Sequence, residues 1–139
     1  MPRTVGDVMS PNALTLSPQA TLEEAILFER KHRVRHIPIM QGGLLVGIVT
    51  DRDIKQATPS IVSGIDRDNY EVVLQTTMLE QIMTRDPVTA TRATPLADAV
   101  ALFAQRRVGC LPVVEDGLVV GIITGTDLLR AFGEMLRGA

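Results

Sequence analysis

Apolar and polar positions follow the same order twice along this chain of 139 residues. Residues 37–40 and 44–49 are short aliphatic runs separated by a glycine-bearing turn, and residues 111–114 and 118–123 repeat this arrangement. Strand-sized apolar runs joined by such turns predict two β-hairpins. The core must be aliphatic, because aromatic residues make up only 3% of the chain and Trp is absent.

Each hairpin follows a predicted helix, in which apolar residues recur at helical spacing. Thr21 with Glu24 three residues later forms a capping-box pattern at the start of the first helix. In the second copy we expect Thr94 to cap the helix and Pro95 to occupy its first position, where a missing N–H costs nothing. A short strand precedes each helix, at residues 13–16 and 87–90, and a last helix follows each hairpin.

The two copies keep one register throughout. Met9 aligns with Met83, an offset of 74 residues, and the same offset then holds without a gap to Asp53 and Asp127. Two copies are too few for a solenoid. We therefore predict a mixed α/β (α+β) fold of two strand-helix-strand-strand-helix repeats related by a pseudo-twofold axis, with residues 1–56 and 78–139 as the repeats.

Between the repeats, residues 57–77 lack the pattern and contain Pro59, Gly64 and a charged run. We interpret them as a linker or surface excursion, with Thr77 capping a short helix that leads to Met83.

The recurring signature is a glycine, two aliphatic residues, a threonine, two variable residues and an aspartate, at residues 47–53 and 121–127. Together with Ile37-Pro38-Ile39 and Leu111-Pro112-Val113, it resembles the CBS domain in its tandem form, the Bateman module. The stretch Arg35-His36-Ile37-Pro38 and residues 50–60 are similar to the CBS portion of acetoin-utilisation AcuB-like proteins. Longer members of that group carry a C-terminal ACT domain, for which we expect no counterpart here.

The signature can hold a nucleotide for physical reasons. Thr50 and Thr124 lie where a strand ends and a helix begins, so hydroxyl and free N–H groups can donate to phosphate or ribose oxygens. Asp53 and Asp127 come one helical turn later and, as carboxylates, suit two ribose hydroxyls. The competing interpretation is that each threonine is only an N-cap and each aspartate only complements the helix dipole.

Apolar positions supply a place for the purine. Gly47 and Gly121 lack a Cβ, so we expect a planar ring to approach the backbone there. The residues that could sandwich the ring are Leu16, Ile48, Ala90 and Ile122.

The resemblance implies that basic residues before the proline-containing strand reach the phosphates. These are Arg35 and His36 in the first copy, whereas Gly109 and Cys110 stand at the equivalent positions of the second. Arg52 is a further phosphate candidate, although it is also expected to be solvated. We therefore expect one stronger phosphate-binding cleft and one weaker or empty cleft, and the sequence leaves open which cleft receives Arg35 and His36.

Other chemistry finds little support. A net charge of −2 gives no cationic field for nucleic acid or an anionic membrane. His32 and His36 lack the neighbours of a metal site, and Cys110 has no base beside it, so we expect no metal and no catalysis. The N-terminus has no apolar leader and no run is long enough to cross a bilayer, which favours the cytoplasm.

We therefore predict a regulatory module, not an enzyme, that binds an adenine nucleotide (AMP, ADP or ATP) or S-adenosylmethionine between its repeats. Binding would change their relative angle or order the connecting segment, and an effector protein unknown from the sequence would read the change. Family resemblance implies a homodimer formed through the helices at residues 22–29 and 96–103. The alternative is a dimerisation scaffold that holds no ligand.

Overall fold

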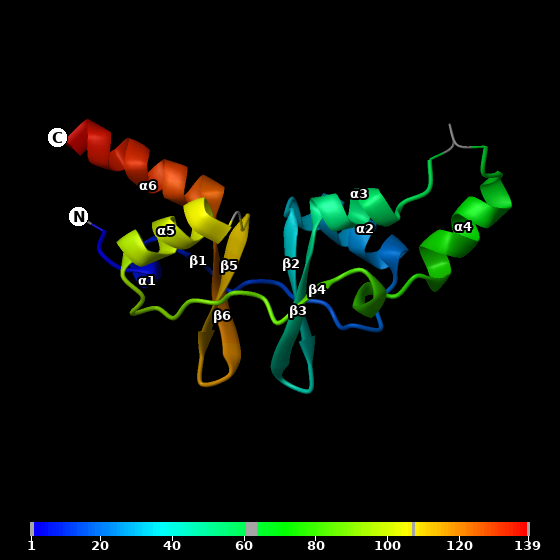
Figure 1. Cartoon of the computed structure of the whole chain (residues 1–139), viewed down its shortest axis with the longest axis horizontal. Coiled ribbons are helices and arrows are strands. Elements are labelled where there is room, and N and C mark those ends of the chain that lie inside the picture. The colour runs from blue at the N-terminus through cyan, green and yellow to red at the C-terminus, as the bar shows by residue number, and fades with distance from the viewer. Residues whose placement is uncertain (1, 61–63, 107, 139) are drawn as a thin grey trace. The chain divides into compact units, whose positions relative to one another are not determined.

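The computed structural model describes residues 2–60, 64–106 and 108–138, and the chain divides into two compact units (Figure 1). The continuous unit is Leu14–Asp86, and the split unit combines Met1–Ala13 with Pro87–Ala139. The units thus exchange short segments relative to the sequence repeats. The first 13 residues belong with the second repeat, and residues 78–86 belong with the first.

The continuous unit is a three-stranded antiparallel sheet covered by helices. Its elements are α2 (Leu22–His32), β2 (His36–Gln41), β3 (Leu44–Thr50), α3 (Asp51–Ala57), α4 (Arg67–Thr76), the short 3₁₀ helix η2 (Leu79–Gln81) and β4 (Thr84–Arg85). The strand order is β2-β3-β4. Its buried centre contains Leu22, Ile37, Ile39, Val49 and Leu79.

The split unit repeats this plan with its own core. Its elements are α1 (Val5–Val8), β1 (Ser10–Pro11), α5 (Leu96–Arg106), β5 (Cys110–Glu115), β6 (Leu118–Thr124) and α6 (Gly125–Gly138). The strand order is β1-β6-β5, so the two-residue strand from the N-terminus takes the place that β4 has in the other sheet. The buried centre contains Val5, Ala99, Leu111, Val113 and Ile123.

Both predicted hairpins are confirmed. β2 pairs with β3 and β5 with β6, each antiparallel, through two-residue turns. The turn residues Gly42 and Gly43 have φ values of 58° and 81°, and Asp116 and Gly117 have 52° and 80°. Two successive positive φ values are the conformation that connects strands with the natural twist, and glycine adopts it without strain.

The predicted first strand of each repeat is reduced to a single bridge. Leu16 bridges Ile39 and Ala90 bridges Val113, both in parallel orientation. In the first case, the Leu16 N–H donates to the Pro38 carbonyl at 3.2 Å and the Leu16 carbonyl accepts from Met40 at 2.9 Å.

Of the caps predicted for the two helices that precede the hairpins, one is confirmed and one is wrong. The Thr21 hydroxyl accepts from the Glu24 N–H at 3.2 Å, and the Glu24 carboxylate accepts from the Thr21 N–H at 3.2 Å. Thr94 does not cap α5, because its hydroxyl accepts from the Thr91 N–H at 2.9 Å. Pro95 precedes the helix instead, and its carbonyl accepts from the Asp98 N–H at 3.0 Å.

The segment between the repeats contains a helix that the sequence did not predict. Residues 67–76 form α4, begun by Asp66, whose carboxylate accepts from the Asn69 N–H at 2.8 Å. Thr77 ends this helix and does not start the next, since its N–H donates to the Val73 carbonyl and η2 begins after Met78. Residues 61–63 of the connector lie outside the described residues.

Candidate functional site

The first Thr-x-x-Asp pair lies at the junction of β3 and α3. The Thr50 N–H and hydroxyl both donate to Oδ2 of Asp53, at 2.9 and 3.0 Å, and the Asp53 N–H donates back to the hydroxyl at 3.2 Å. This capping box explains why α3 begins here. It leaves Oδ1 of the half-buried Asp53 without a hydrogen bond or ion pair in the described part of the chain.

The basic candidates lie beside this pair, in their own repeat. His36 is the cross-strand partner of Thr50, and the Asp51 N–H donates to the Arg35 carbonyl at 2.8 Å. Burial, assisted by the Arg35 charge, lowers the pKa of His36 below its usual 6.5. At neutral pH the positive charge at this position therefore comes from the exposed Arg35, while His36 is a neutral donor or acceptor.

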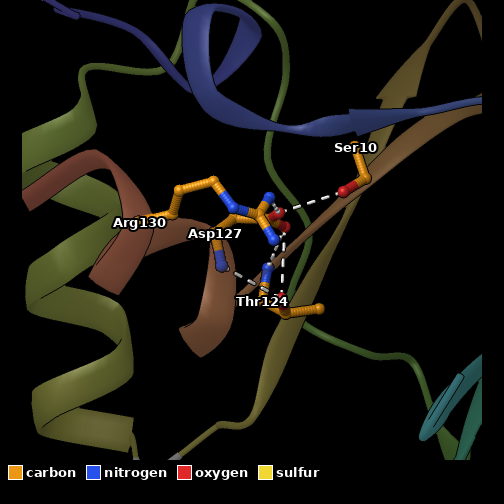
Figure 2. A network of polar contacts seen from close by, with 4 residues as sticks. All are labelled: Ser10, Thr124, Asp127 and Arg130. Carbon is orange, nitrogen blue, oxygen red and sulfur yellow. Dashed lines mark hydrogen bonds and ion pairs between the residues drawn. The ribbon is translucent and has the colours of Figure 1, made fainter. Parts of the chain in front are cut away.

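The second Thr-x-x-Asp pair has the same cap but more partners (Figure 2). Oδ2 of Asp127 accepts from the N–H and hydroxyl of Thr124 at 2.9 and 3.1 Å. Its Oδ1 accepts from the Ser10 hydroxyl at 3.0 Å and lies 3.7 Å from Nη1 of Arg130. Asp127 is only 5% exposed, so this carboxylate is a buried, fully engaged anchor between β1 and α6.

Two sequence differences separate the pairs. At the offset of 74 residues, Thr84 corresponds to Ser10 and Gln56 corresponds to Arg130. Thr84 pairs with Ile48 in the sheet, as Ser10 pairs with Ile122, yet its side chain makes no hydrogen bond to Asp53 among the described residues. Ser10 therefore completes the hydrogen-bond network of Asp127, and the sequence analysis did not identify it. Its alignment with Thr84 was the one sequence feature that could have drawn attention to it.

At the position equivalent to His36, the split unit has a side chain that is neither charged nor reactive. Cys110 is the cross-strand partner of Thr124 and is 6% exposed. Burial raises the pKa of its thiol to about 12, so it stays neutral and is a poor nucleophile. Gly109 before it has no side chain to offer a phosphate.

The signature glycines have a role other than the one we expected. A Cβ on Gly47 would lie 2.5 Å from Sδ of Met83 and 2.9 Å from the Thr84 carbonyl oxygen. A Cβ on Gly121 would lie 2.7 Å from the Ser10 carbonyl oxygen and 2.9 Å from Sδ of Met9. The space beside each glycine is already filled by protein, so the expectation that a ligand ring approaches there is wrong.

The apolar candidates divide between the two units. Leu16 and Ile48 belong to the continuous unit, and Ala90 and Ile122 to the split unit. Ile48 is 7% and Ala90 5% exposed, while Leu16 and Ile122 are half-buried. Arg52 is exposed in the first turn of α3, with no ion pair among the residues that the structure describes.

A carboxyl pair beside the first site was not predicted. Glu29 of α2 and Asp51 of α3 line one cavity of about 530 Å³ with Lys55, and Lys55 pairs with Asp51 at 3.0 Å. No sequence pattern links residues 22 positions apart, so only the packing of α2 on α3 reveals it.

Residues 2–60, 64–106 and 108–138 contain no group of three or more His, Cys, Asp or Glu side chains that could hold a metal ion. Within the same residues, no helix has both the length and the apolar character needed to cross a bilayer.

Comparison with known proteins identifies the family. A model of the CBS domain matches residues 5–60 and again residues 79–134. The chain belongs to the CBS domain family. It is a tandem CBS pair, as its sequence signature predicted.

Relatives of this CBS pair include proteins of very different size. The CBS domain-containing protein YhcV of Bacillus subtilis is 33% identical over 125 residues, which cover 90% of this chain and 82% of that protein. A homoserine O-acetyltransferase of Methanohalophilus mahii is 34% identical over 133 residues, but these are only 25% of that enzyme. The similarity to such enzymes is thus confined to a part of their length.

Solved CBS pairs have the same fold. The CBS pair of protein MJ0100, in complex with 5′-methylthioadenosine and S-adenosyl-L-methionine, is 31% identical with a TM-score of 0.79 and covers 95% of this chain and 97% of that one. CBSX2 in complex with AMP is 27% identical with a TM-score of 0.78, covering 96% and 98%. A putative acetoin utilization protein (AcuB) from Vibrio cholerae is 27% identical with a TM-score of 0.79, covering 96% and 93%.

Proposed function

We propose that this CBS pair is a regulatory module that binds an adenine nucleotide or adenosyl compound at the Thr50–Asp53 end of the continuous unit. AMP, ADP and ATP are the first candidates and S-adenosylmethionine the next, because solved CBS pairs hold AMP or S-adenosyl-L-methionine. In this proposal the ligand is a cytoplasmic metabolite, the module serves energy sensing, and an effector protein reads its occupancy.

One observation carries the proposal. Asp53 is held in place by Thr50 through one carboxylate oxygen, while its other oxygen has no hydrogen-bond partner among the described residues. A carboxylate that is fixed and only accepts suits the hydroxyls of a ribose. Arg35 directly precedes β2 and offers a planar, permanently charged group to a phosphate. The neutral His36, the cross-strand partner of Thr50, can add a hydrogen bond.

The same reasoning makes the split unit the weaker site. Asp127 already uses both oxygens, and a ligand would have to displace the Ser10 hydroxyl and the Arg130 guanidinium from it. Cys110 and Gly109 supply no charge there. The proposal is therefore asymmetric, with tighter binding of phosphate-bearing ligands by the continuous unit.

The matched variants Asp53→Ala and Asp127→Ala test both the binding site at Asp53 and its asymmetry with Asp127. Isothermal titration with AMP, ADP, ATP and S-adenosylmethionine should show that Asp53→Ala lowers the affinity for the tightest of them by roughly tenfold or more, because hydrogen bonds to a charged group contribute about 1.5–3 kcal/mol. Asp127→Ala should keep that affinity but lower the melting temperature. The proposal fails if Asp53→Ala binds every compound as the wild type does, or if no compound binds the wild type.

A homodimer is the second part of the proposal, and exposed apolar side chains favour it. Leu27 on α2 and Val100 on α5, within the helices predicted for dimerisation, are 56% and 47% exposed. Leu129, Phe132 and Leu136 on α6 are 73%, 57% and 62% exposed. Apolar side chains so exposed on helices are typical of interfaces.

Light scattering coupled to size exclusion tests the dimer. We expect twice the chain mass for the wild type and a smaller mass for Phe132→Glu. Dimer formation without any ligand-induced rise in melting temperature would favour the pure scaffold over the sensor.

A further inference from the structure

Glu29 has an unusual environment next to the proposed site. It lies in the second half of α2 and lines the cavity of about 530 Å³ between α2, α3 and α4. Its Oε2 atom is buried from solvent and has no hydrogen-bond donor among the described residues. A buried carboxylate oxygen without a donor is costly, and a proton on the carboxyl removes that cost.

The group facing Glu29 is a second carboxyl. Asp51, the first residue of α3, lines the same cavity and pairs with Nζ of Lys55 at 3.0 Å. Two carboxylates can only accept, so Glu29 and Asp51 form a hydrogen bond only when one of them carries a proton. The Lys55 contact lowers the pKa of Asp51, whereas burial and then the Asp51 charge raise the pKa of Glu29 to about 7. The shared proton therefore resides on Glu29.

This carboxyl pair is connected to the candidate site through Asp51 and Arg35. Asp51 directly follows Thr50, and its N–H holds the Arg35 carbonyl at 2.8 Å. The Arg35 guanidinium stabilises the charged forms of both Glu29 and Asp51. A phosphate bound to Arg35 would compete with these carboxylates for the same positive charge.

Other ionisable groups surround the carboxyl pair. Glu23 and Arg30 on α2 and Tyr70 on α4 line the same cavity. Histidine is the residue usually expected to titrate near neutral pH. Burial and Arg35 lower the pKa of His36, however, although the Asp51 charge opposes them, so that imidazole stays neutral.

We propose that Glu29 and Asp51 share a proton, and that uptake of this proton strengthens the binding of a phosphate-bearing ligand beside Arg35. The second half of this statement rests on the proposed function. With Glu29 ionised, one more negative charge opposes the phosphate. With Glu29 protonated, that repulsion is absent and Arg35 is shared with one carboxylate fewer.

The sign of the coupling follows from linkage. A bound phosphate is an anion, so it favours the neutral form of Glu29 and raises its pKa further. Affinity is then highest below about pH 7, falls as the pH rises through the pKa of Glu29, and levels off above it. We expect a roughly fivefold fall in affinity between the acidic and the alkaline limit, at the low end of usual coupling between linked sites.

The ligand arm of the test uses AMP and three proteins. Calorimetric titrations at several pH values compare the wild type with Glu29→Gln, an isostere of the protonated form, and with Glu23→Gln, which removes the same charge from the same helix and cavity. The phosphate of AMP titrates identically in all three experiments, so differences between proteins report the side chains. Glu29→Gln should lose the pH-dependent fall and keep the affinity of the acidic limit, whereas Glu23→Gln should follow the wild type.

The stability arm needs no ligand. A carboxyl whose pKa rises from 4.5 to about 7 on folding stabilises the fold fully below pH 4.5, and this contribution is lost as the pH rises through 7. Urea unfolding between pH 5 and 8 should therefore show a loss in the wild type that is absent in Glu29→Gln, and Asp51→Asn should move the loss to lower pH. Parallel curves for wild type and Glu29→Gln would overturn the shared proton. If the shared proton holds and AMP binds, but with the same pH dependence in both proteins, only the coupling is overturned. If AMP binds none of them, the proposed function and the coupling fail together.

Discussion

Gly47→Ala should destabilise the protein because the glycine is a packing requirement of the sheet. The new Cβ would lie 2.5 Å from Sδ and 2.9 Å from Cγ of Met83, and 2.9 Å from the Thr84 carbonyl oxygen, where ordinary contacts are 3.4–4 Å. The methionine side chain can rotate away, but the Thr84 carbonyl belongs to β4, which pairs with β3 at this residue. A shift of about half an ångström is then forced on a backbone strand, and overpacking of this kind costs about 1–3 kcal/mol.

Urea unfolding and thermal melting measure the effect. For a chain of this size each kcal/mol lowers the melting temperature by roughly 3 °C, so we expect a loss of about 3–9 °C. Gly125→Ala is the matched control, because no atom of the described residues beyond its chain neighbours and its own helix backbone lies within 4 Å of its Cβ, and alanine favours a helix. In a double-mutant cycle, Met83→Ala should recover part of the loss, with a coupling of about 0.5–3 kcal/mol. A Gly47→Ala protein as stable as the wild type but weaker in AMP binding would refute this reasoning. It would indicate that Gly47 serves ligand binding and not packing.

Three further outcomes follow from the buried polar groups. Ser10→Ala should lower the free energy of unfolding by about 1–3 kcal/mol, since Oδ1 of the buried Asp127 loses its hydrogen-bond donor, whereas Thr84→Ala at the equivalent position should cost less in the same urea titration. Cys110 should resist iodoacetamide at pH 8 in the native protein and react once the protein is unfolded, because burial raises its pKa to about 12; mass spectrometry would expose the contrary result as rapid native labelling. His36→Gln should reduce the stability lost on acidification below about pH 6.5, because a histidine whose pKa is lowered by folding stabilises the native state above that pH; equal losses in both proteins would contradict the shift.

Local sequence signals were sufficient for the hairpins and for most helix starts. Short apolar runs joined by glycine-bearing turns predicted β2–β3 and β5–β6, and the Thr21–Glu24 box predicted α2. These features depend on residues that are close in sequence, so the pattern contains the necessary information. The error at Thr94 came from reading the cap locally, although the repeat offset itself aligns Pro95 with Thr21.

The exchange of edge strands could not be predicted in the same way. β1 and β4 are two residues long, and each pairs with a strand far away in the sequence, Ser10 with Ile122 and Thr84 with Ile48. Segments so short carry no periodicity of their own. In retrospect, the methionines were the available signal. The flexible side chain of Met9 fills the space that Gly121 leaves, and that of Met83 fills the space at Gly47.

The predicted asymmetry of the two repeats rests on different causes in the sequence and in the structure. From sequence, Arg35 and His36 against Gly109 and Cys110 suggested a stronger first site on the basis of charge. In the structure Arg35 still supplies a positive charge, but His36 is neutral. Only one of the two expected charges therefore favours the first site. It adds a cause that the sequence did not suggest, namely that Ser10 and Arg130 already occupy the aspartate of the second repeat.

These two causes make different predictions for engineered symmetry. If charge limits the second repeat, then Cys110→His should create phosphate binding there. If the occupied carboxylate limits it, Cys110→His should add nothing unless Ser10→Ala and Arg130→Gln also free Oδ1 of Asp127. Oδ1 of the buried Asp127 already has Ser10 and Arg130 as partners, so we expect a second AMP equivalent in calorimetry only for the combined variant. A second equivalent in the single Cys110→His variant would show that the network of Figure 2 is no obstacle to the ligand.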